Sequence, residues 1–141
     1  MTISASETCI FCKIIAGEEK SFIVFEDNHC IAFLDKRPVF LGHCLVMTKK
    51  HVNTFYDLSE SQVTSLCLVA QKVGKAVEKG MKAQGSFIGL NNIISQSVPH
   101  CHIHIIPRNK QDGLRGFFWP RNPYKNEEEM LAVQNAIKKF L

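Results

Sequence analysis

The stretch Ser95-Gln96-Ser97-Val98-Pro99-His100-Cys101-His102-Ile103-His104-Ile105-Ile106-Pro107-Arg108 places three histidines at alternate positions, with apolar residues between them. Alternation with a period of two is typical of a β-strand that has one face buried. On such a strand His100, His102 and His104 share one face, with roughly 7 Å between successive side chains. The apolar residues between them point to the opposite face. We therefore predict a strand with one chemical face and one packing face.

Three histidines on one face are more than packing requires. Imidazole, with a usual pKa of about 6.5, serves at neutral pH as base, acid, nucleophile or metal ligand. One zinc ion held by all three rings is excluded, because the outer two lie roughly 13 to 14 Å apart while zinc ligands lie about 2 Å from the metal. The row therefore predicts acid–base or nucleophilic chemistry.

The pattern His-apolar-His-apolar-His followed by two apolar residues resembles the signature of the histidine triad (HIT) family of nucleotide hydrolases and transferases. The strands expected along the chain predict an α+β fold, with an antiparallel sheet of about five strands, one long helix and a C-terminal helix. The resemblance adds that such proteins pair into homodimers across the long helix and an edge strand.

The composition fits one globular domain over residues 1–141. The chain is 45% hydrophobic and 21% charged, which is enough for one core and too little for two comfortable domains. A net charge of +4 suits a small anionic ligand, and we expect no nucleic-acid partner. No apolar run approaches the roughly 20 residues that span a bilayer, and the N-terminus lacks signal-peptide features. We expect a cytoplasmic protein without membrane contact.

Two of the six cysteines, Cys9 and Cys12, are spaced as half of a tetrahedral zinc site. His51 and His100 are the candidates for the other two ligands. The resemblance supports this choice, because many prokaryotic HIT proteins close a structural zinc site with histidines at these two positions. Free thiols without metal are the alternative reading, and a redox role fits the position of the pair less well.

The remaining four cysteines lie within apolar segments, where a reduced thiol packs as a small hydrophobic side chain. They are Cys30, Cys44, Cys67 and Cys101.

Residues 22–26 and 30–35 read as a hairpin of two strands. Asp35 ends the second strand, where a carboxylate can accept hydrogen bonds from both ribose hydroxyls. The resemblance assigns Asp35 this role and places Ile31 and Phe33 beside the base. The plain alternative is that Asp35 is a turn residue ahead of Lys36-Arg37-Pro38.

A third strand over residues 42–48 carries His43, which the resemblance places beside His102 and His104. Thr48 stands where family members usually have proline. A long helix follows, because Ser59 and Gln62 form a capping box ahead of an apolar stripe that Gly80 ends. The stripe is expected to contain Val63, Leu66, Cys67, Ala70, Val73, Gly74 and Val77.

A fourth strand over residues 86–92 ends at Asn91 and Asn92, and a short connection makes it antiparallel to the histidine strand. By resemblance one of these asparagines lies near the substrate phosphate, and Asn91 is slightly favoured; asparagine also simply tolerates turn geometry. Gln96 and Ser97 are expected to hold phosphate oxygens through side chains or backbone N–H groups.

The C-terminal segment ends in a helix. Three glutamates at residues 127–129 and Lys138 and Lys139 match its dipole, and a buried stripe of Met130, Val133, Ile137 and Phe140 is expected. Before it, Trp119 with Arg115 and Arg121 could fold over a nucleotide or pack on the core or a partner.

The predicted function is nucleotidyl hydrolysis, with a purine nucleotide as substrate. His102 attacks the α-phosphate of a dinucleoside polyphosphate or nucleoside phosphoramidate, forms a nucleotidyl-histidine and releases a nucleoside monophosphate. His104 protonates the leaving group, and His43 and His100 support the network. The alternative is a purine-nucleotide-binding adaptor with negligible turnover.

Overall fold

The computed structural model describes residues 8–114 and 122–141. The chain divides into two compact units, Met1–Lys110 and Gln111–Leu141. The first unit carries the sheet with helices α2 and α3, and the second carries α4. The tail residues Arg115, Trp119 and Arg121 lie outside the described residues. The single domain over 1–141 stays a prediction.

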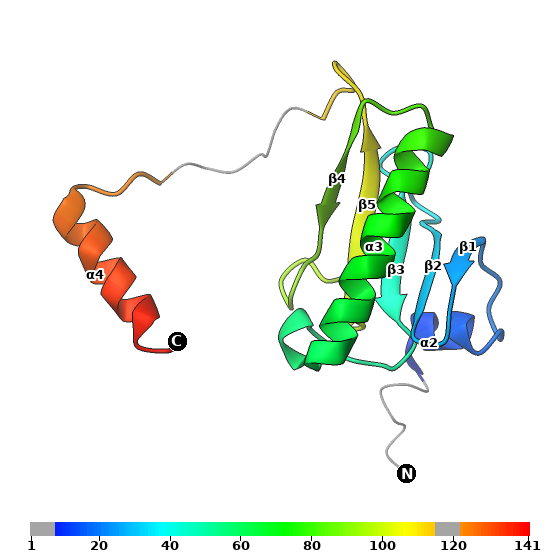
Figure 1. The fold of residues 1–141 in the computed structure, drawn as a ribbon, viewed down its shortest axis with the longest axis horizontal. Coiled ribbons are helices and arrows are strands. Elements are labelled where there is room, and N and C mark those ends of the chain that lie inside the picture. Colours follow the sequence, from blue (N-terminus) through cyan, green and yellow to red (C-terminus); the bar gives the residue numbers. More distant parts are fainter. Residues whose placement is uncertain (1–7, 115–121) are drawn as a thin grey trace, which may run out of the picture. The chain divides into compact units, whose positions relative to one another are not determined.

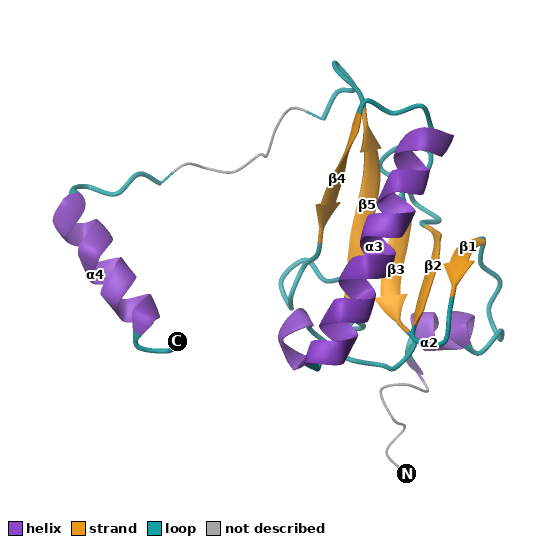
Figure 2. Cartoon of the chain, viewed as in Figure 1, coloured by secondary structure: helices purple, strands orange, loops and turns teal. Residues whose placement is uncertain are grey.

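Five antiparallel strands form one sheet in the order β1-β2-β3-β5-β4, which confirms the predicted α+β class (Figure 1, Figure 2). The strands are β1 Ile23–Glu26, β2 Cys30–Leu34, β3 Cys44–Thr48, β4 Gly85–Gly89 and β5 His102–Arg108. The histidine strand begins two residues later than the alternation predicts. The reason is that Cys101 donates its N–H to Val52 O, at 2.7 Å, outside the sheet.

The long helix α3 spans Glu60–Gly80 and begins as predicted. Ser59 Oγ accepts from Gln62 N, and Gln62 Oε1 accepts from Ser59 N at 2.9 Å. One prediction for this helix is wrong, because Cys67 is exposed. The buried stripe runs through Leu66 and Val69 instead, which turns the neighbouring Cys67 away from the sheet.

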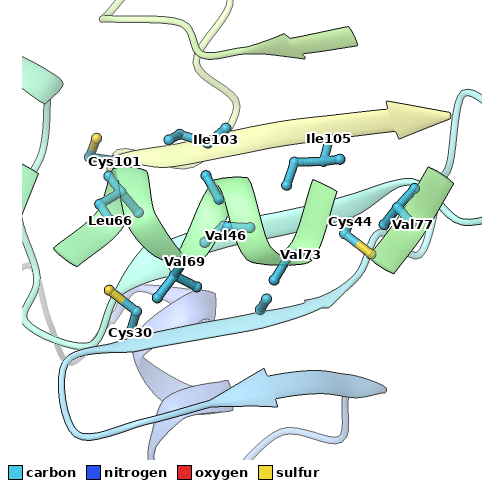
Figure 3. Close-up of a cluster of buried hydrophobic side chains, with 12 residues drawn as sticks. Cys30, Cys44, Val46, Leu66, Val69, Val73, Val77, Cys101, Ile103 and Ile105 are labelled. Atoms are coloured by element: carbon cyan, nitrogen blue, oxygen red, sulfur yellow. The ribbon is translucent and has the colours of Figure 1, made fainter. Parts of the chain in front are cut away.

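Helix α3 covers one face of the sheet (Figure 1), and its buried side chains meet those of the strands in the first core cluster (Figure 3). Cys101, Ile103 and Ile105 belong to this cluster, as the alternation predicts for the residues between the histidines. A capped turn of 3₁₀ helix at Phe55–Asp57 leads into α3.

The opposite face carries the second core cluster, under the short helix α2, which spans Ile10–Ile15. Phe11 and Ile14 of α2 pack there with side chains of β2 and β3, namely Ile31, Phe33, Leu45 and Met47. The strands contribute alternate residues to the two clusters, as period-two geometry requires. Gly17 follows α2 with a φ of 77°, a left-handed conformation that glycine adopts without strain.

Strand register sets the neighbours of the histidines on the α2 face. His104 pairs with Leu45, which pairs with Phe33 on the next strand. His102 pairs with Met47, which pairs with Ile31. Both histidines therefore stand in apolar rows, and His102 is 5% exposed.

Helix α4 spans Glu127–Lys138, and Asn126 caps it by accepting a hydrogen bond from Glu129 N at 2.9 Å. Within its own unit, α4 buries none of its predicted apolar stripe, since Met130 is 51% exposed and Phe140 90% exposed. Burial of the stripe against another part of the protein stays a prediction. Among the helices of the described ranges, none has the length and apolar character needed to cross a bilayer.

Candidate active site and metal centre

A cavity of ≈ 320 Å³ on the α2 face collects half of the predicted nucleotide-binding residues, together with His102 and His104. Its walls are apolar with a few polar groups, the usual character of a small-molecule site. The lining includes Phe11 and Ile14 of α2, Phe33 and Leu45 of the sheet, and Asp35, Ser97, His102 and His104. Larger hollows of ≈ 510 Å³ beside α4 and ≈ 390 Å³ beside Lys49 contain none of the predicted site residues. The size of a cavity alone therefore does not identify the functional site.

His102 has one ring nitrogen committed to the backbone. Its Nδ1 lies 2.6 Å from the carbonyl oxygen of His100. A carbonyl oxygen only accepts, so Nδ1 carries the proton and Nε2 keeps a free lone pair. Burial lowers the pKa of His102, which keeps the ring neutral at neutral pH. The Phe11 ring stands edge-on to His102, with centroids 5.1 Å apart. The arrangement gives a held, neutral imidazole with a free Nε2.

His43 and His104 form a second ordered pair. The backbone N–H of Val39 donates to His43 Nδ1 at 3.2 Å, so the proton of neutral His43 is on Nε2. His43 Nε2 lies 2.9 Å from His104 Nδ1 and donates to it. Neutral His104 therefore carries its proton on Nε2. Burial foremost, with the charges of His102 and His43 adding, lowers the pKa of His104 to about 4.

Asp35 stands at the end of β2 and lines the cavity. Its Oδ1 accepts from Arg37 N at 2.8 Å, which is the turn contact expected of this position. Its Oδ2 lies 3.7 Å from His43 Nδ1. Burial lowers the pKa of His43, although Asp35 acts in the opposite direction. The same carboxylate thus closes the turn and faces the histidine pair.

Four ligand-type side chains meet beside this cavity: Cys9, Cys12, His51 and His100, whose ligand atoms all lie within 4.8 Å of one another. Cys12 Sγ is 3.2 Å from His51 Nδ1 and 3.6 Å from His100 Nδ1, and Cys9 Sγ is also 3.6 Å from His100 Nδ1. These atoms come from α2, the segment after β3 and the residues before β5. The sequence predicted these four residues as one ligand set but could not give the distances between their ligand atoms.

The protonation pattern of this cluster fits a zinc ion. His100 Nε2 donates to Thr48 O at 2.8 Å, and His51 Nε2 to Asn53 Oδ1 at 3.0 Å. Both Nδ1 lone pairs are therefore free on the side of the thiols. Burial, with Cys9 adding, raises the pKa of Cys12 to about 11, a cost that a bound cation reverses because thiolates are its ligands. Two thiols and two imidazoles are a common structural zinc set.

A further group of metal-ligand type, Asp35, His43 and His104, does not offer the same lone pairs. Val39 N–H occupies His43 Nδ1, and the proton of His43 Nε2 occupies His104 Nδ1. This group is a proton-carrying network.

Several predicted residues lie elsewhere. Ile31 is 1% exposed in the core, beneath the cavity, and does not line it. Asn91 donates to Ser95 O at 3.3 Å, and Asn92 Oδ1 accepts from Phe55 N at 2.8 Å. Gln96 also binds backbone groups, with both ends of its amide. The roles of these side chains toward phosphate stay predictions.

Sequence reasoning missed Phe11 and Val98 as cavity walls, and Thr48 and Asn53 as partners of the zinc-type histidines. Nothing in the sequence marks Asn53, because its backbone contact is with Gln96, 43 residues away, and its contact with the nearby His51 depends on how the His51 ring is turned.

Comparison with known proteins decides the family. The HIT domain matches residues 16–111, which contain the sheet, α3 and all three alternating histidines. The chain belongs to the HIT family. The HIT-family crystal structure from Bacillus subtilis superposes with a TM-score of 0.87 at 36% identity, covering 96% of this chain and 98% of that one. The predicted recognition is confirmed.

Two further HIT proteins bear on chemistry. The adenosine 5'-monophosphoramidase hnt1 of Schizosaccharomyces pombe is 34% identical over 121 residues, 86% of this chain and 90% of that protein. The Zn-bound histidine triad protein of Mycobacterium smegmatis has a TM-score of 0.73 at 30% identity, over 96% of this chain and 99% of that one. Hydrolases acting on nucleotides and a zinc-bound member thus occur among its relatives.

Proposed function

We propose that this HIT protein hydrolyses a nucleotide at its α-phosphate through a nucleotidyl intermediate on His102 Nε2. The observation that carries the proposal is the hydrogen bond from His102 Nδ1 to His100 O, because it leaves Nε2 as a neutral nucleophile at a cavity. A phosphoramidate is the favoured substrate, since a relative that covers most of the chain is named for that activity. Dinucleoside polyphosphates are the second substrate class.

Proton supply follows from the His43–His104 pair. An anionic phosphate beside these rings raises their pKa, so the pair gains a proton when substrate binds. The added proton belongs on His43 Nδ1, which faces Asp35 at 3.7 Å, and the hydrogen bond from Val39 N–H to this nitrogen is given up when the proton is added. His104 then gives its Nε2 proton to the leaving group, while the Nε2 proton of His43 moves to His104 Nδ1. Both rings end neutral.

Nucleotide placement follows from the walls of the cavity. Phe33 lies against the base, above the buried Ile31, and Asp35 Oδ2 accepts from the ribose. Ser97 holds the phosphate near His102, because both line the cavity. Gln96, next to Ser97, supports this end, with Asn91 at the start of the same loop.

Zinc belongs to the structural part of the proposal. Cys9, Cys12, His51 and His100 would hold it, and the bound ion would tie α2 to the residues before β5. His100 serves both sites, since its Nδ1 faces the thiols while its carbonyl oxygen holds His102.

The protein is also expected to form a homodimer through α3 and the edge strand β4. Both surfaces expose large apolar side chains, with Leu68 62% and Ile88 50% exposed. Ile88→Lys should shift the mass measured by light scattering toward the monomer, whereas an unchanged mass would contradict this interface.

Purified protein should be tested against a lysyl adenosine phosphoramidate and diadenosine tetraphosphate. We expect AMP release from the first, and an adenylyl group on His102 when the reaction is quenched in alkali and the protein is analysed by mass spectrometry. His29→Ala is the control, because His29 is exposed and lies outside both histidine clusters. Tight AMP binding without turnover or labelling would favour the adaptor instead.

A further inference from the structure

The loop of residues 91–97, which ends at Ser97 on the cavity, is held in a strained conformation. Ile93 has a φ of 66° and Ser95 a φ of 61°, a region that side-chain-bearing residues rarely adopt and a β-branched residue least of all. Such conformations persist only where surrounding contacts over-determine them. The contacts of this loop therefore matter for how it presents Ser97.

Some of those contacts lie within the loop. Gln96 Oε1 accepts from Ile93 N at 3.0 Å, and Asn92 O accepts from Ile94 N at 2.7 Å. They close the turn but do not fix it to the rest of the protein.

Two other contacts fasten the loop to the segment of residues 51–55. Gln96 Nε2 donates to Asn53 O at 2.6 Å, and Asn92 Oδ1 accepts from Phe55 N at 2.8 Å. Asn53 is also the partner of His51 Nε2, at 3.0 Å through its side-chain oxygen. One residue thus contacts a zinc-type ligand through its side chain and the substrate loop through its backbone.

We propose that Asn53 is a positioning residue that couples metal occupancy to nucleotide binding, by joining His51 to the loop of residues 91–97. The inference rests on the proposed function. When zinc holds His51 Nδ1, the ring is fixed and Nε2–H fixes Asn53, whose carbonyl oxygen holds Gln96.

Without the metal, His51 Nδ1 has only its contact with Cys12 Sγ, at 3.2 Å, so the ring holds Asn53 less firmly. The strained loop then loses part of its support, while the bond from Phe55 N to Asn92 Oδ1 remains.

The coupling must be reciprocal, because it is a free energy between two binding events. Zinc should tighten AMP binding by about 5- to 100-fold, and AMP should tighten zinc binding by the same factor. His100 offers a second route, since its carbonyl oxygen holds His102. Variants of Gln96 separate the routes, because Gln96 contacts the loop and Asn53 and no ligand of the metal.

The experiment measures four affinities: AMP with and without Zn²⁺ by calorimetry, and Zn²⁺ with and without AMP by competition with a chelator. In Gln96→Leu and Gln96→Glu we expect the coupling factor to fall toward one, while Zn²⁺ affinity without AMP stays near wild type. Gln96→Glu keeps the acceptor for Ile93 N and loses the donor to Asn53. Its added negative charge weakens AMP binding with and without Zn²⁺ alike, so the coupling factor, a ratio of the two affinities, still tests that bond if the leucine variant does not fold.

Asn53→Leu should weaken Zn²⁺ binding by about 10- to 100-fold, as removal of a hydrogen-bond partner of a metal ligand does, and should lower the coupling. Asn53→Asp keeps the acceptor oxygen and should restore Zn²⁺ affinity. The matched control is Gln84→Leu, which removes a glutamine contact to Lys110 N, at 2.7 Å, on a different loop. It should behave as wild type.

A coupling factor that is unchanged in both Gln96 variants would assign the linkage to His100 and overturn the role of Asn53. Wild-type protein that binds AMP equally well with and without Zn²⁺ would overturn the coupling and leave the proposed function intact. Protein that binds no AMP in either form would overturn the proposed function, and the coupling with it.

Discussion

His100 and His102 are the same residue type two positions apart, yet their free nitrogens differ. The carbonyl of Thr48 holds Nε2 of His100, which leaves Nδ1 for the thiols of Cys9 and Cys12. The carbonyl of His100 holds Nδ1 of His102, which leaves Nε2 free at the cavity. On each ring, one backbone carbonyl decides which nitrogen stays free. His100 is thereby suited to bind metal, and His102 to act as a nucleophile.

The comparison is tested most strongly at His102. His102→Asn should lower kcat/KM for the phosphoramidate by about 10⁴-fold or more, because the covalent route is lost. Bound zinc per chain, measured by atomic emission, should stay at the wild-type value. The His29→Ala control should retain both. Activity within tenfold of wild type would exclude His102 as the nucleophile.

His104 tests the proton-donor side of the cavity. His104→Gln should lower kcat by about 10²- to 10⁴-fold for an amine leaving group, the usual contribution of a general acid. A nitrophenyl ester should lose much less, since nitrophenolate leaves without a proton. Steady-state kinetics on the two substrates gives the ratio. Equal losses would instead indicate that His104 only shapes the site.

Cys12 tests the metal side. Cys12→Ser should remove bound zinc and lower the thermal midpoint by about 10 °C, because a ligand at high occupancy stabilises the fold by roughly 4 kcal/mol. Cys67→Ser, at an exposed cysteine, is the matched control and should not shift the midpoint. Scanning calorimetry gives the thermal midpoint of each variant, and zinc analysis gives its bound metal. An equal midpoint in both variants would argue against a structural metal.

The smallest expected effect is a loss of folding stability at acid pH, which tests whether His104 is neutral in the folded protein. Burial depresses the folded-state pKa of His104 to about 4, so between that value and about 6.5 the unfolded chain binds more protons. Stability should therefore fall as pH drops from 7 to 5. Urea midpoints at both pH values should differ less in His104→Gln than in wild type. An equal difference would assign the acid sensitivity to other groups.

Local patterns predicted the parts of the fold that local physics controls. The capping box of Ser59 and Gln62 fixed the start of α3, and the alternation around Ile103 assigned the packing face of β5. Cys67 was predicted wrongly. A helical period alone does not say which residues of a helix are turned inward.

In the candidate site, too, local sequence patterns predicted some residues and tertiary contacts decided the others. The spacing of Cys-x-x-Cys predicted a zinc site, and the spacing of the alternating histidines predicted a catalytic strand. Thr48 and Phe11 did not stand out in this way, because each acts through a contact with a segment far away in the chain. Asn53 lies two residues from His51, but its bond to Gln96, 43 residues away, forms only in the folded chain.

The resemblance placed Asn91 near the substrate phosphate, and Gln96 was expected to hold phosphate oxygens because it lies just before the histidines. Both amides bind backbone groups in this structure.

The sequence by itself determined the α+β class, the family and the residue types of both clusters, since periodicity and spacing are local properties of a chain. Only the tertiary structure decided which nitrogen of each histidine is free. That choice depends on which backbone carbonyl or N–H group reaches the ring, and those groups come from Thr48, Val39 and His100 on separate segments.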